Sequence, residues 1–232
     1  MKLDLIWWRP YRTIDDVDVL AVDLSFDRER EAFARRLLDR GELARHEAFL
    51  VDGARRRFLL SRGAIRVLLA DRLGCSPAQL AFAGSKNGKP YAVLDGTQAP
   101  ISFNLSHSGN FGLIALSPSR SVGIDVEERR DRIDIDGVAK QVFAATERDA
   151  LARLDRAEKR DLFFRLWTLK EALIKAKGTG LHYDPSRFAV PKGVLAGSDN
   201  GLFGFAEEGE PKWRLYDLGC ESFAAALAFA LR

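Results

Sequence analysis

The spacing of apolar residues changes along the chain, and these changes predict a mixture of strands and helices. Short apolar runs and alternating runs predict strands at 17–24, on either side of the turn at 87–90, and at 112–117, 121–128, 188–191, 213–218 and 223–231. Apolar residues at three- and four-residue steps predict helices at about 28–49, 54–73 and 158–177, with another helix starting near Thr146 and Asp149. The polar segment 104–110 is predicted to be a loop. This order of elements indicates an α+β fold.

Two stretches of the chain have a similar pattern. The sequence RFLLSRGAI at 57–65 resembles RLWTLKEAL at 165–173, and each lies in a predicted helix that follows an apolar strand. The repeat predicts two similar α+β halves, related by a pseudo-twofold axis and joined near Pro118, with boundaries at 1–118 and 119–232. Because a cleft between two halves is a common place for a ligand, we expect the active site there.

Composition narrows the class of protein. The chain has 232 residues, of which 47% are hydrophobic and 30% charged, so it has enough apolar residues for a folded core. Its net charge of +3 is too small to indicate nucleic-acid binding. Twelve arginines lie between Arg28 and Arg72; most are expected on solvated helix faces, and a few are candidates for an anion site.

The sequence also predicts where the protein resides. Cys75 and Cys220 occur in unrelated contexts without metal-ligand spacing, which favours reduced thiols in the cytoplasm. No signal peptide is evident, and no apolar run approaches the roughly 18 residues of a membrane helix. A soluble cytoplasmic protein that binds neither a membrane nor nucleic acid is therefore expected.

Two segments place acidic and basic side chains together. Asp125 and Glu127 alternate with apolar residues on a predicted strand, so both carboxylates point to one face, where a hard divalent cation would relieve their repulsion. The alternative is two solvated acids at a strand end. Glu171 and Lys175 are neighbours on one helix face, and a surface salt bridge is the alternative there.

Two polar turns complete the candidates. Ser106 and His107 offer short hydrogen-bond donors that suit phosphate oxygens, although an ordinary polar loop would look the same. The turn Asn87-Gly88-Lys89-Pro90 has a basic tip, and a plain hairpin turn is the alternative.

Taken together, the segments VGIDVEE, FFRLWTLKEALIKAKG, FNLSHSG and NGKP resemble the Sfp-type 4′-phosphopantetheinyl transferases. The paired signature is a strand with Asp-x-Glu followed by Trp-x-x-Lys-Glu-Ala-x-x-Lys, and here Asp125 and Lys170 stand 45 positions apart (170 minus 125). The similarity runs from about Arg55 to Val190. Two departures concern the adenine side: the segment Ser85-Lys86 before NGKP lacks the aromatic residue often seen there, and the tail of the signature reads KGTGL, where some relatives have a second lysine.

The resemblance implies a role for each matching residue. It makes Asp125, Glu127 and Glu171 the ligands of Mg²⁺, with Mn²⁺ as the alternative ion, and it gives Glu171, Lys175 and Asp125 the catalytic roles. The coenzyme A contacts that it implies are Arg45, Arg57, Arg62, Lys89, Pro90, Ser106, His107, Lys170 and Lys175. The first three are expected near the 3′-phosphate, and Lys89 and Pro90 near the adenine.

The implied activity is transfer of 4′-phosphopantetheine from coenzyme A to a serine of an apo acyl or peptidyl carrier protein, with release of 3′,5′-ADP. The family resemblance also implies a monomer with one active site. The alternatives are a non-catalytic coenzyme A or nucleotide-binding module on the same fold and an unrelated Mg²⁺-dependent phosphoryl-transfer enzyme. The chain has no GxxxxGK[ST] segment and no kinase signature, which weakens the latter.

Overall fold

The computed structural model describes residues 6–131, 133–180, 183–205, 209 and 211–231. Its secondary structure is mixed, and the predicted α+β class is confirmed. The first half of the chain forms β1 (Trp8–Ile14), β2 (Val17–Asp23), α1 (Arg28–Leu37), α2 (Arg40–Glu47), α3 (Asp52–Leu73), β3 (Leu80–Gly84), β4 (Pro90–Leu94), β5 (Thr97–Gln98), β6 (Ser102–Ser108) and β7 (Phe111–Ser117). The second half forms β8 (Val122–Glu128), α4 (Ile135–Val142), α5 (Ala145–Ala152), α6 (Arg156–Lys177), α7 (Lys192–Leu195), β9 (Asn200–Gly204), β10 (Lys212–Asp217) and β11 (Phe223–Ala230).

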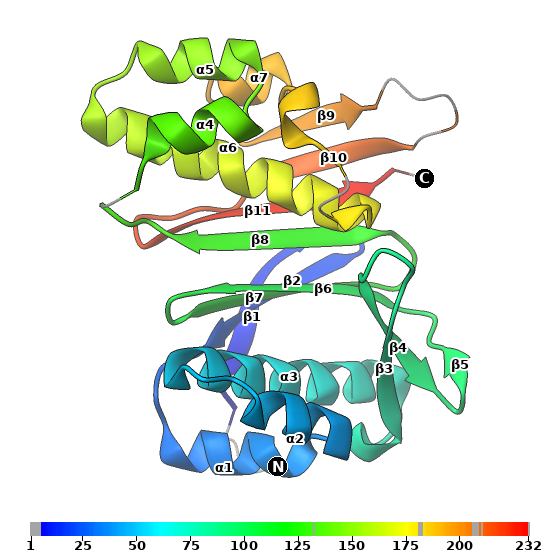
Figure 1. Ribbon diagram of the computed structural model, residues 1–232. Coiled ribbons are helices and arrows are strands. Elements are labelled where there is room, and N and C mark those ends of the chain that lie inside the picture. The colour runs from blue at the N-terminus through cyan, green and yellow to red at the C-terminus, as the bar shows by residue number, and fades with distance from the viewer. Residues whose placement is uncertain (1–5, 132, 181–182, 206–208, 210, 232) are drawn as a thin grey trace.

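Two antiparallel four-stranded sheets lie face to face in the middle of the molecule (Figure 1). One has the strand order β1-β2-β7-β6 and is covered by α1, α2 and α3; the other has the order β8-β11-β10-β9 and is covered by the helices α4 to α7. The described residues also form a small sheet from β3, β4 and β5. The molecule therefore has four layers, with helices outside and sheets inside.

Each interface between layers has its own apolar core. Leu60, Ile65 and Leu69 of α3 pack on the first sheet, and Leu166, Leu169 and Leu173 of α6 pack on the second. A third core joins the two sheets and includes Val19, Leu113, Ile124, Val126, Leu227 and Phe229. Since both faces of each sheet are covered, β7 and β11 are apolar along nearly their whole length, and β8 is buried from Val122 to Val126 although it carries three acids.

The two long helices have matching positions. Both α3 and α6 have 22 residues, and each covers one of the two central sheets. The two stretches that resemble each other in sequence, 57–65 and 165–173, fall in α3 and α6. The division of the chain at residues 118 and 119 remains a prediction.

Three of the predicted elements differ in the structure. The helix expected at 28–49 is interrupted, because Asp39 accepts a hydrogen bond from the Glu42 amide and starts a new helix. Residues 102–108 form strand β6, although a loop was predicted at 104–110. No strand forms at 188–191, and the ninth strand lies instead at Asn200–Gly204.

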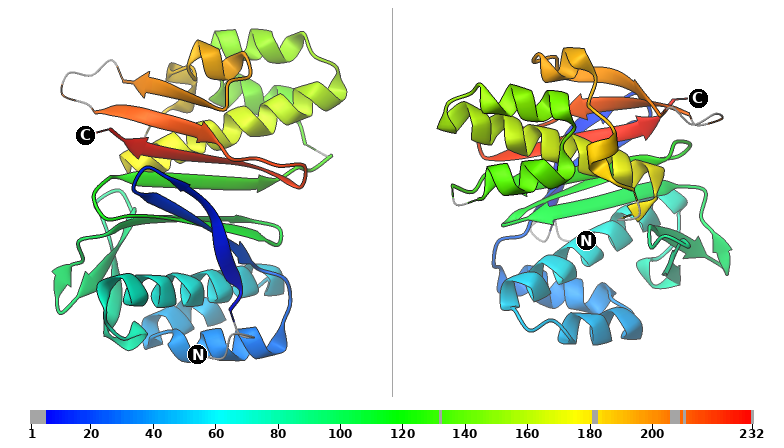
Figure 2. Two further views of the ribbon diagram at one scale, coloured as in Figure 1. Left: turned by 180° about the vertical axis from the view of Figure 1, so that it is seen from behind. Right: turned by 45° about the horizontal axis from the view of Figure 1, so that its top comes forward.

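The β1–β2 hairpin crosses from the first sheet towards the second on the back of the molecule (Figure 2). The hydroxyl of Tyr11 donates a hydrogen bond to the Leu218 carbonyl at 2.6 Å, which ties β1 to the chain beside β10. Among the helices of the described chain, none has the length and apolar composition needed for a membrane span.

Candidate functional site

The polar side chains of β6 face β8, the first strand of the second sheet. Ser106 Oγ donates to Asp125 Oδ1 at 2.8 Å, and Ser108 Oγ donates to Glu127 Oε2 at 2.6 Å. Asn104 Oδ1 accepts a hydrogen bond from the β8 backbone at 2.8 Å. The three β6 residues are two positions apart, so they share one face of the strand. The segment FNLSHSG therefore connects the two sheets through hydrogen bonds.

A glycine brings α6 close to β8. A Cβ atom built on Gly123 would lie 2.1 Å from the Ala172 carbonyl oxygen and 2.3 Å from the Ala176 amide nitrogen, distances that no side chain can occupy. Gly123 thus allows the backbones of strand and helix to touch. As a result, Glu171 and Lys175 of α6 come close to the carboxylates of β8.

Lys175 of α6 binds side chains of both β6 and β8. Its Nζ lies 2.6 Å from Asp125 Oδ1 and 3.0 Å from Ser106 Oγ. Asp125 is only 3% exposed, and its other oxygen, Oδ2, is buried without a hydrogen-bond partner among the described residues. A buried carboxylate oxygen without a partner is costly, and it marks a place where a ligand or an ion would be favourable.

The three carboxylates predicted to bind metal influence one another. Burial raises the pKa of Glu171; the Lys175 charge opposes this shift, while the charges of Asp125 and Glu127 add to it. Burial likewise raises the pKa of Glu127, where the Ser108 hydrogen bond opposes the shift and the charge of Asp125 adds to it. Carboxylates that repel one another in a partly buried place are stabilised by a cation.

The donor set fits a hard divalent cation. Within the described ranges, no three His, Cys, Asp or Glu side chains are already gathered into a cation site. However, Asp125 Oδ2 has no partner and the mutual repulsion of the three acids is only partly balanced by Lys175. These oxygen ligands are the type that Mg²⁺ takes, usually together with phosphate oxygens and water.

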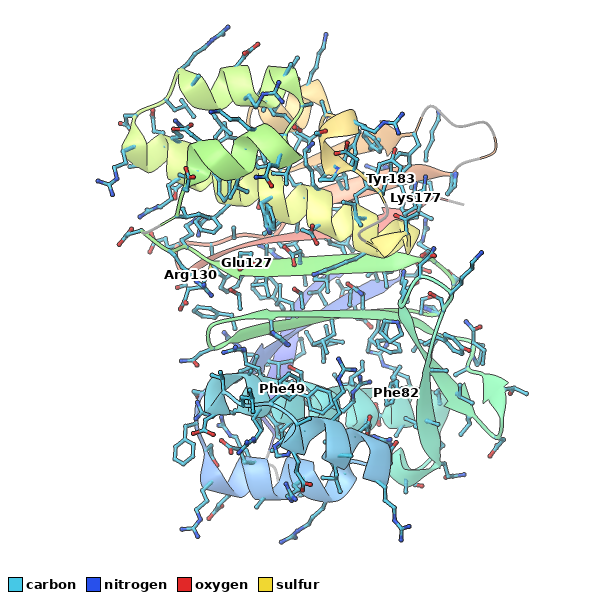
Figure 3. All side chains as sticks on the ribbon, viewed as in Figure 1. Phe49, Phe82, Glu127, Arg130, Lys177 and Tyr183 are labelled. Carbon is cyan, nitrogen blue, oxygen red and sulfur yellow. The ribbon has the colours of Figure 1, made fainter. Side chains whose placement is uncertain are left out.

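A cavity of about 480 Å³ opens along the same face of α6. Glu171, Lys175 and Trp167 line it from the helix, and Lys89 and Pro90 line it from the turn before β4. The other lining residues are Asn87, Gly88, Asn104, Val142, Ile174, Gly178, Gly180, Tyr183 and Pro185. In Figure 3, Tyr183 lies beyond the C-terminal end of α6 and Glu127 lies near the opposite end of the α6–β8 layer. The cavity joins segments that are far apart in sequence.

The ammonium group of Lys89 is already bound by the protein. Its Nζ donates to Ser121 Oγ at 3.1 Å, to the Val122 carbonyl at 2.9 Å and to the Ala176 carbonyl at 3.0 Å. Burial lowers its pKa to about 8. These bonds fasten the turn at 87–90 to the ends of β8 and α6 and close one end of the cavity.

Two of the predicted basic residues of the first half, Arg45 and Arg62, lie over the same ring, that of Phe58. Arg62 Nε lies 3.3 Å from Glu42 Oε1, and its guanidinium also stacks over Phe82, whereas Arg45 is exposed. The partners of these two arginines all belong to the first half of the chain. Arg62 is already paired with a carboxylate of that half, Glu42.

Arg57 is close enough to His107 to affect it. The pKa of His107 is lowered by desolvation and further by the charges of Arg57 and Lys175. His107 is adjacent to Ser106 on β6, so their side chains point to opposite faces. If both contact phosphate, the groups that they contact must lie on different sides of this strand.

Lys170 is far from solvent. It is 2% exposed and makes an ion pair with Glu147 of α5, and it does not line the cavity.

The roles of three residues, Glu147, Asn104 and Ser108, were not predicted from the sequence. The period-two spacing of Asn104, Ser106 and Ser108 was the signal that could have revealed the last two.

Another cavity, of about 570 Å³, lies between β1, the β6–β7 turn and the β10–β11 turn. Trp8, Tyr11, Phe111 and Phe223 are among its lining residues. It contains none of the residues predicted from sequence, whereas the smaller cavity contains four of them: Lys89, Pro90, Glu171 and Lys175. The smaller cavity is therefore the candidate active site.

This chain is similar to known proteins, both by matches to family models and by its identity to curated relatives. Residues 121–228 match a family model described as the 4′-phosphopantetheinyl transferase superfamily, and residues 27–119 match one described as 4′-phosphopantetheinyl transferase, N-terminal. The 4′-phosphopantetheinyl transferase HetI of Nostoc sp. is 40% identical over 144 residues, which are 62% of this chain and 61% of HetI.

Two further relatives give the same result. A putative 4′-phosphopantetheinyl transferase of Synechocystis sp. is 40% identical over 145 residues, 62% of this chain and 58% of that protein. The 4′-phosphopantetheinyl transferase Sfp of Bacillus subtilis is 34% identical over 134 residues, 58% of this chain and 57% of Sfp. The chain thus spans about three fifths of the length of the curated relatives it matches.

Proposed function

The chain belongs to the 4′-phosphopantetheinyl transferase superfamily, and from this premise we propose that it transfers the 4′-phosphopantetheine group of coenzyme A to a serine of an apo carrier protein. The observation that supports the proposal most is that Glu171 and Lys175 line the cavity and that Lys175 pairs with Asp125, one buried oxygen of which lacks a partner among the described residues. The superfamily supplies the substrate class and the site supplies groups suited to a diphosphate.

In the proposed reaction, the serine oxygen forms a bond to the phosphorus on the pantetheine side of the diphosphate. The bond from that phosphorus to the oxygen of 3′,5′-ADP breaks, and the serine proton passes to a base. The nucleophile is a neutral alcohol and the electrophile is an anion, so the site must supply both a base and positive charge.

Asp125, Glu127 and Glu171 would hold Mg²⁺, and Mn²⁺ has a similar preference for oxygen ligands. When bound, the ion would supply charge neutralisation and Lewis-acid activation at the diphosphate. The Asp125 oxygen that lacks a partner among the described residues supports this assignment, as do the pKa values of Glu127 and Glu171, which are raised first by burial and further by neighbouring carboxylates.

Lys175 and Glu171 would act directly on the reacting groups. Lys175 is one helical turn from Glu171, and its ammonium would bind the diphosphate and balance the charge that develops on the leaving group. Glu171 would accept the serine proton, because its raised pKa brings its basicity closer to neutral pH.

The rest of the coenzyme would follow the cavity and the strand β6. Pro90 and the turn at 87–90 form the wall proposed for adenine, and Ser106 lies beside the proposed diphosphate position. Arg57 and His107, on the other face of β6, are proposed for the 3′-phosphate, with Arg45 nearest to solvent among the predicted arginines. Arg62 would contribute only if its pairing with Glu42 changed.

The proposed partners are apo acyl or peptidyl carrier proteins, and the proposed working form is a monomer. Cys75 and Cys220 are free thiols, as expected for a protein that works in the cytoplasm.

Mass spectrometry of a panel of apo carriers incubated with the protein, coenzyme A and Mg²⁺ tests the proposal. We expect one phosphopantetheine group on the target serine and no product when EDTA is present. If the protein bound coenzyme A but left every carrier unmodified, a non-catalytic coenzyme A-binding module would be the better description.

A further inference from the structure

Lys170, one of the two lysines of the Trp-x-x-Lys-Glu-Ala-x-x-Lys signature, has no proton left for a ligand. Its Nζ lies 2.7 Å from Glu147 Oε2, donates to the Pro185 carbonyl at 2.8 Å and donates also to the Phe188 carbonyl. An ammonium group has three N–H donors, and here each has an acceptor. The Phe188 ring adds a cation–π contact at 4.5 Å from its centroid.

Glu147 is as fully engaged as Lys170. It is 0% exposed; Oε1 accepts the Val190 amide at 2.8 Å, and Oε2 accepts the Ala144 amide at 2.8 Å as well as the Lys170 ammonium. The pair thereby replaces the strand hydrogen bonds that residues 188–191 would otherwise need. It ties together the start of α5, the middle of α6 and the segment 185–190.

This segment forms part of the wall of the proposed coenzyme A cavity. Pro185, whose carbonyl Lys170 binds, lines the cavity together with Tyr183. The rings of Tyr183 and Phe188 are 5.8 Å apart, so a shift of Phe188 would be transmitted to the cavity wall. Lys170 also immediately precedes Glu171, which lines the cavity from the helix side.

We propose that Lys170 and Glu147 are positioning residues: their buried ion pair holds the 183–190 wall against α6 and sets the shape of the coenzyme A cavity, while Lys170 itself contacts no part of the coenzyme. This inference rests on the proposed function, because it takes the cavity to be the coenzyme A site. It replaces the coenzyme contact that the family resemblance implied for Lys170.

The pair lends itself to a double-mutant cycle. Removing one partner leaves a buried charge without its counterion, whereas removing both avoids the unpaired charge and leaves only the backbone groups of Ala144, Pro185, Phe188 and Val190 without their side-chain partners. Coenzyme A affinity, measured by calorimetry for Lys170→Met, Glu147→Leu and the double variant, therefore separates positioning from contact. We expect each single variant to weaken binding by about 10-fold or more, as loss of supporting partners around a site commonly does. The double variant should bind better than either single variant but less well than the wild type, because no charge is left unpaired while the backbone groups still lack their partners.

Glu147→Gln serves as a second variant in case a single apolar substitution prevents folding. The amide keeps the shape of the side chain, and its oxygen still accepts one of the two backbone N–H groups. Positioning predicts weaker coenzyme A binding and a change in both KM and kcat. A direct Lys170 contact predicts unchanged or tighter binding, because a lysine proton would be released for the ligand.

Lys159→Met is the matched control, since Lys159 is on the same helix and pairs with exposed Asp136 at 2.7 Å. It should leave coenzyme A binding unchanged. The inference is overturned if Glu147→Gln binds as well as the wild type, or if the double variant binds no better than Lys170→Met. A wild-type protein that fails to bind coenzyme A at all would overturn the proposed function, and this inference with it.

Discussion

Two buried polar networks, one in each half of the chain, differ in whether both oxygens of a carboxylate lie next to a cation. Glu42 has Arg66 at one oxygen and Arg62 at the other, 3.3 Å away, whereas among the described residues Asp125 has only Lys175, at one oxygen. Arg66 of α3 is 1% exposed; its Nε bonds to Glu42 at 2.7 Å, its Nη2 to Asp39 at 2.6 Å, and its Nη1 to the carbonyls of Pro77 and Leu80. Asp125 of β8 is almost as buried, yet its Oδ2 has no partner in the described structure.

The comparison separates structural charges from functional ones. The Arg66 network binds α2, α3 and the chain before β3 into one unit and gives four of the five guanidinium N–H groups an acceptor. The Asp125 network joins β6, β8 and α6; it leaves Asp125 Oδ2 without a partner among the described residues, while Lys175, which pairs with the other oxygen, lines the cavity. Arg66, Lys170 and Lys175 all carry a positive charge, so charge alone does not show which of them is available to a ligand. The number of hydrogen-bond and ion-pair partners of each side chain does.

The largest expected effect is on catalysis. Glu171→Gln should lower kcat by about 10²–10⁴-fold, because it removes the proposed proton acceptor and one cation ligand, while coenzyme A binding weakens only modestly. Carrier modification followed by mass spectrometry gives the rate, and calorimetry gives the affinity. Normal turnover in this variant would refute the role of Glu171.

Arg66→Met tests the Arg66 network and should reduce stability instead. Loss of the guanidinium leaves Asp39 without its counterion, Glu42 with Arg62 alone, and the Pro77 and Leu80 carbonyls without their donor, which should cost about 3–5 kcal/mol in the free energy of unfolding. Arg72→Met is the control: Arg72 pairs with Asp18 at the surface, so it should cost about 0–1 kcal/mol. Equal losses in urea titrations of the two variants would contradict the difference drawn here.

Gly123→Ala should disturb the Asp125 network by moving the backbone of α6. The added methyl group would clash with the Ala172 carbonyl, so α6 must move away from β8, at a cost of about 1–3 kcal/mol in stability. Because Glu171 and Lys175 move with the helix, transfer should fall by up to about 10²-fold. Gly204→Ala in β9, where a Cβ meets nothing within 4 Å, should change neither quantity.

As the pH falls, protonation of Glu171 should lower the transfer activity and should by itself add to the stability of the folded protein. The pKa of Glu171 in the folded protein is raised above the ordinary 4.5, so between these two values the folded state binds the proton more readily. As pH falls through this window, Glu171 contributes a gain in stability while the proposed base is lost. The stability gain should be smaller in Glu171→Gln, and equal acid profiles for the two proteins would argue against a raised pKa.

The smallest expected effect concerns Lys89. Its pKa of about 8 lies below the ordinary 10.5, so from pH 8 towards 10.5 the unfolded chain holds a proton that the folded protein has released. Lys89 should therefore contribute stability that grows as pH rises through this window. Lys89→Met should lack the rise in thermal unfolding curves, and a parallel rise in both proteins would assign it to other groups.

The sequence was sufficient for the α+β class and for the elements that bear Asp125, Glu127, Glu171 and Lys175, because their strand and helix have clear apolar periodicities. Segment 188–191 looks like a strand in sequence. It is not one, because Lys170 and Glu147 take its backbone hydrogen bonds. Such a partnership has no characteristic spacing along the chain.

The sequence predicted which helix or strand bears each side chain, but not which partners that side chain has in the fold. Lys170 and Lys175 stand five positions apart on one helix, yet one faces α5 and the other faces Asp125. The signature contains both lysines and does not say which has its donors filled. The break at Asp39 was equally hidden, since the arginine-rich pattern of 28–49 runs through it.

Crystals grown with coenzyme A and Mn²⁺ test the central assignment most directly, because the ion can be located from its anomalous scattering. The account predicts a peak in contact with Asp125 Oδ2, within reach of Glu127 and Glu171, and Lys175 turned towards the diphosphate. Coenzyme A bound in the cavity with no ion beside Asp125 would contradict it.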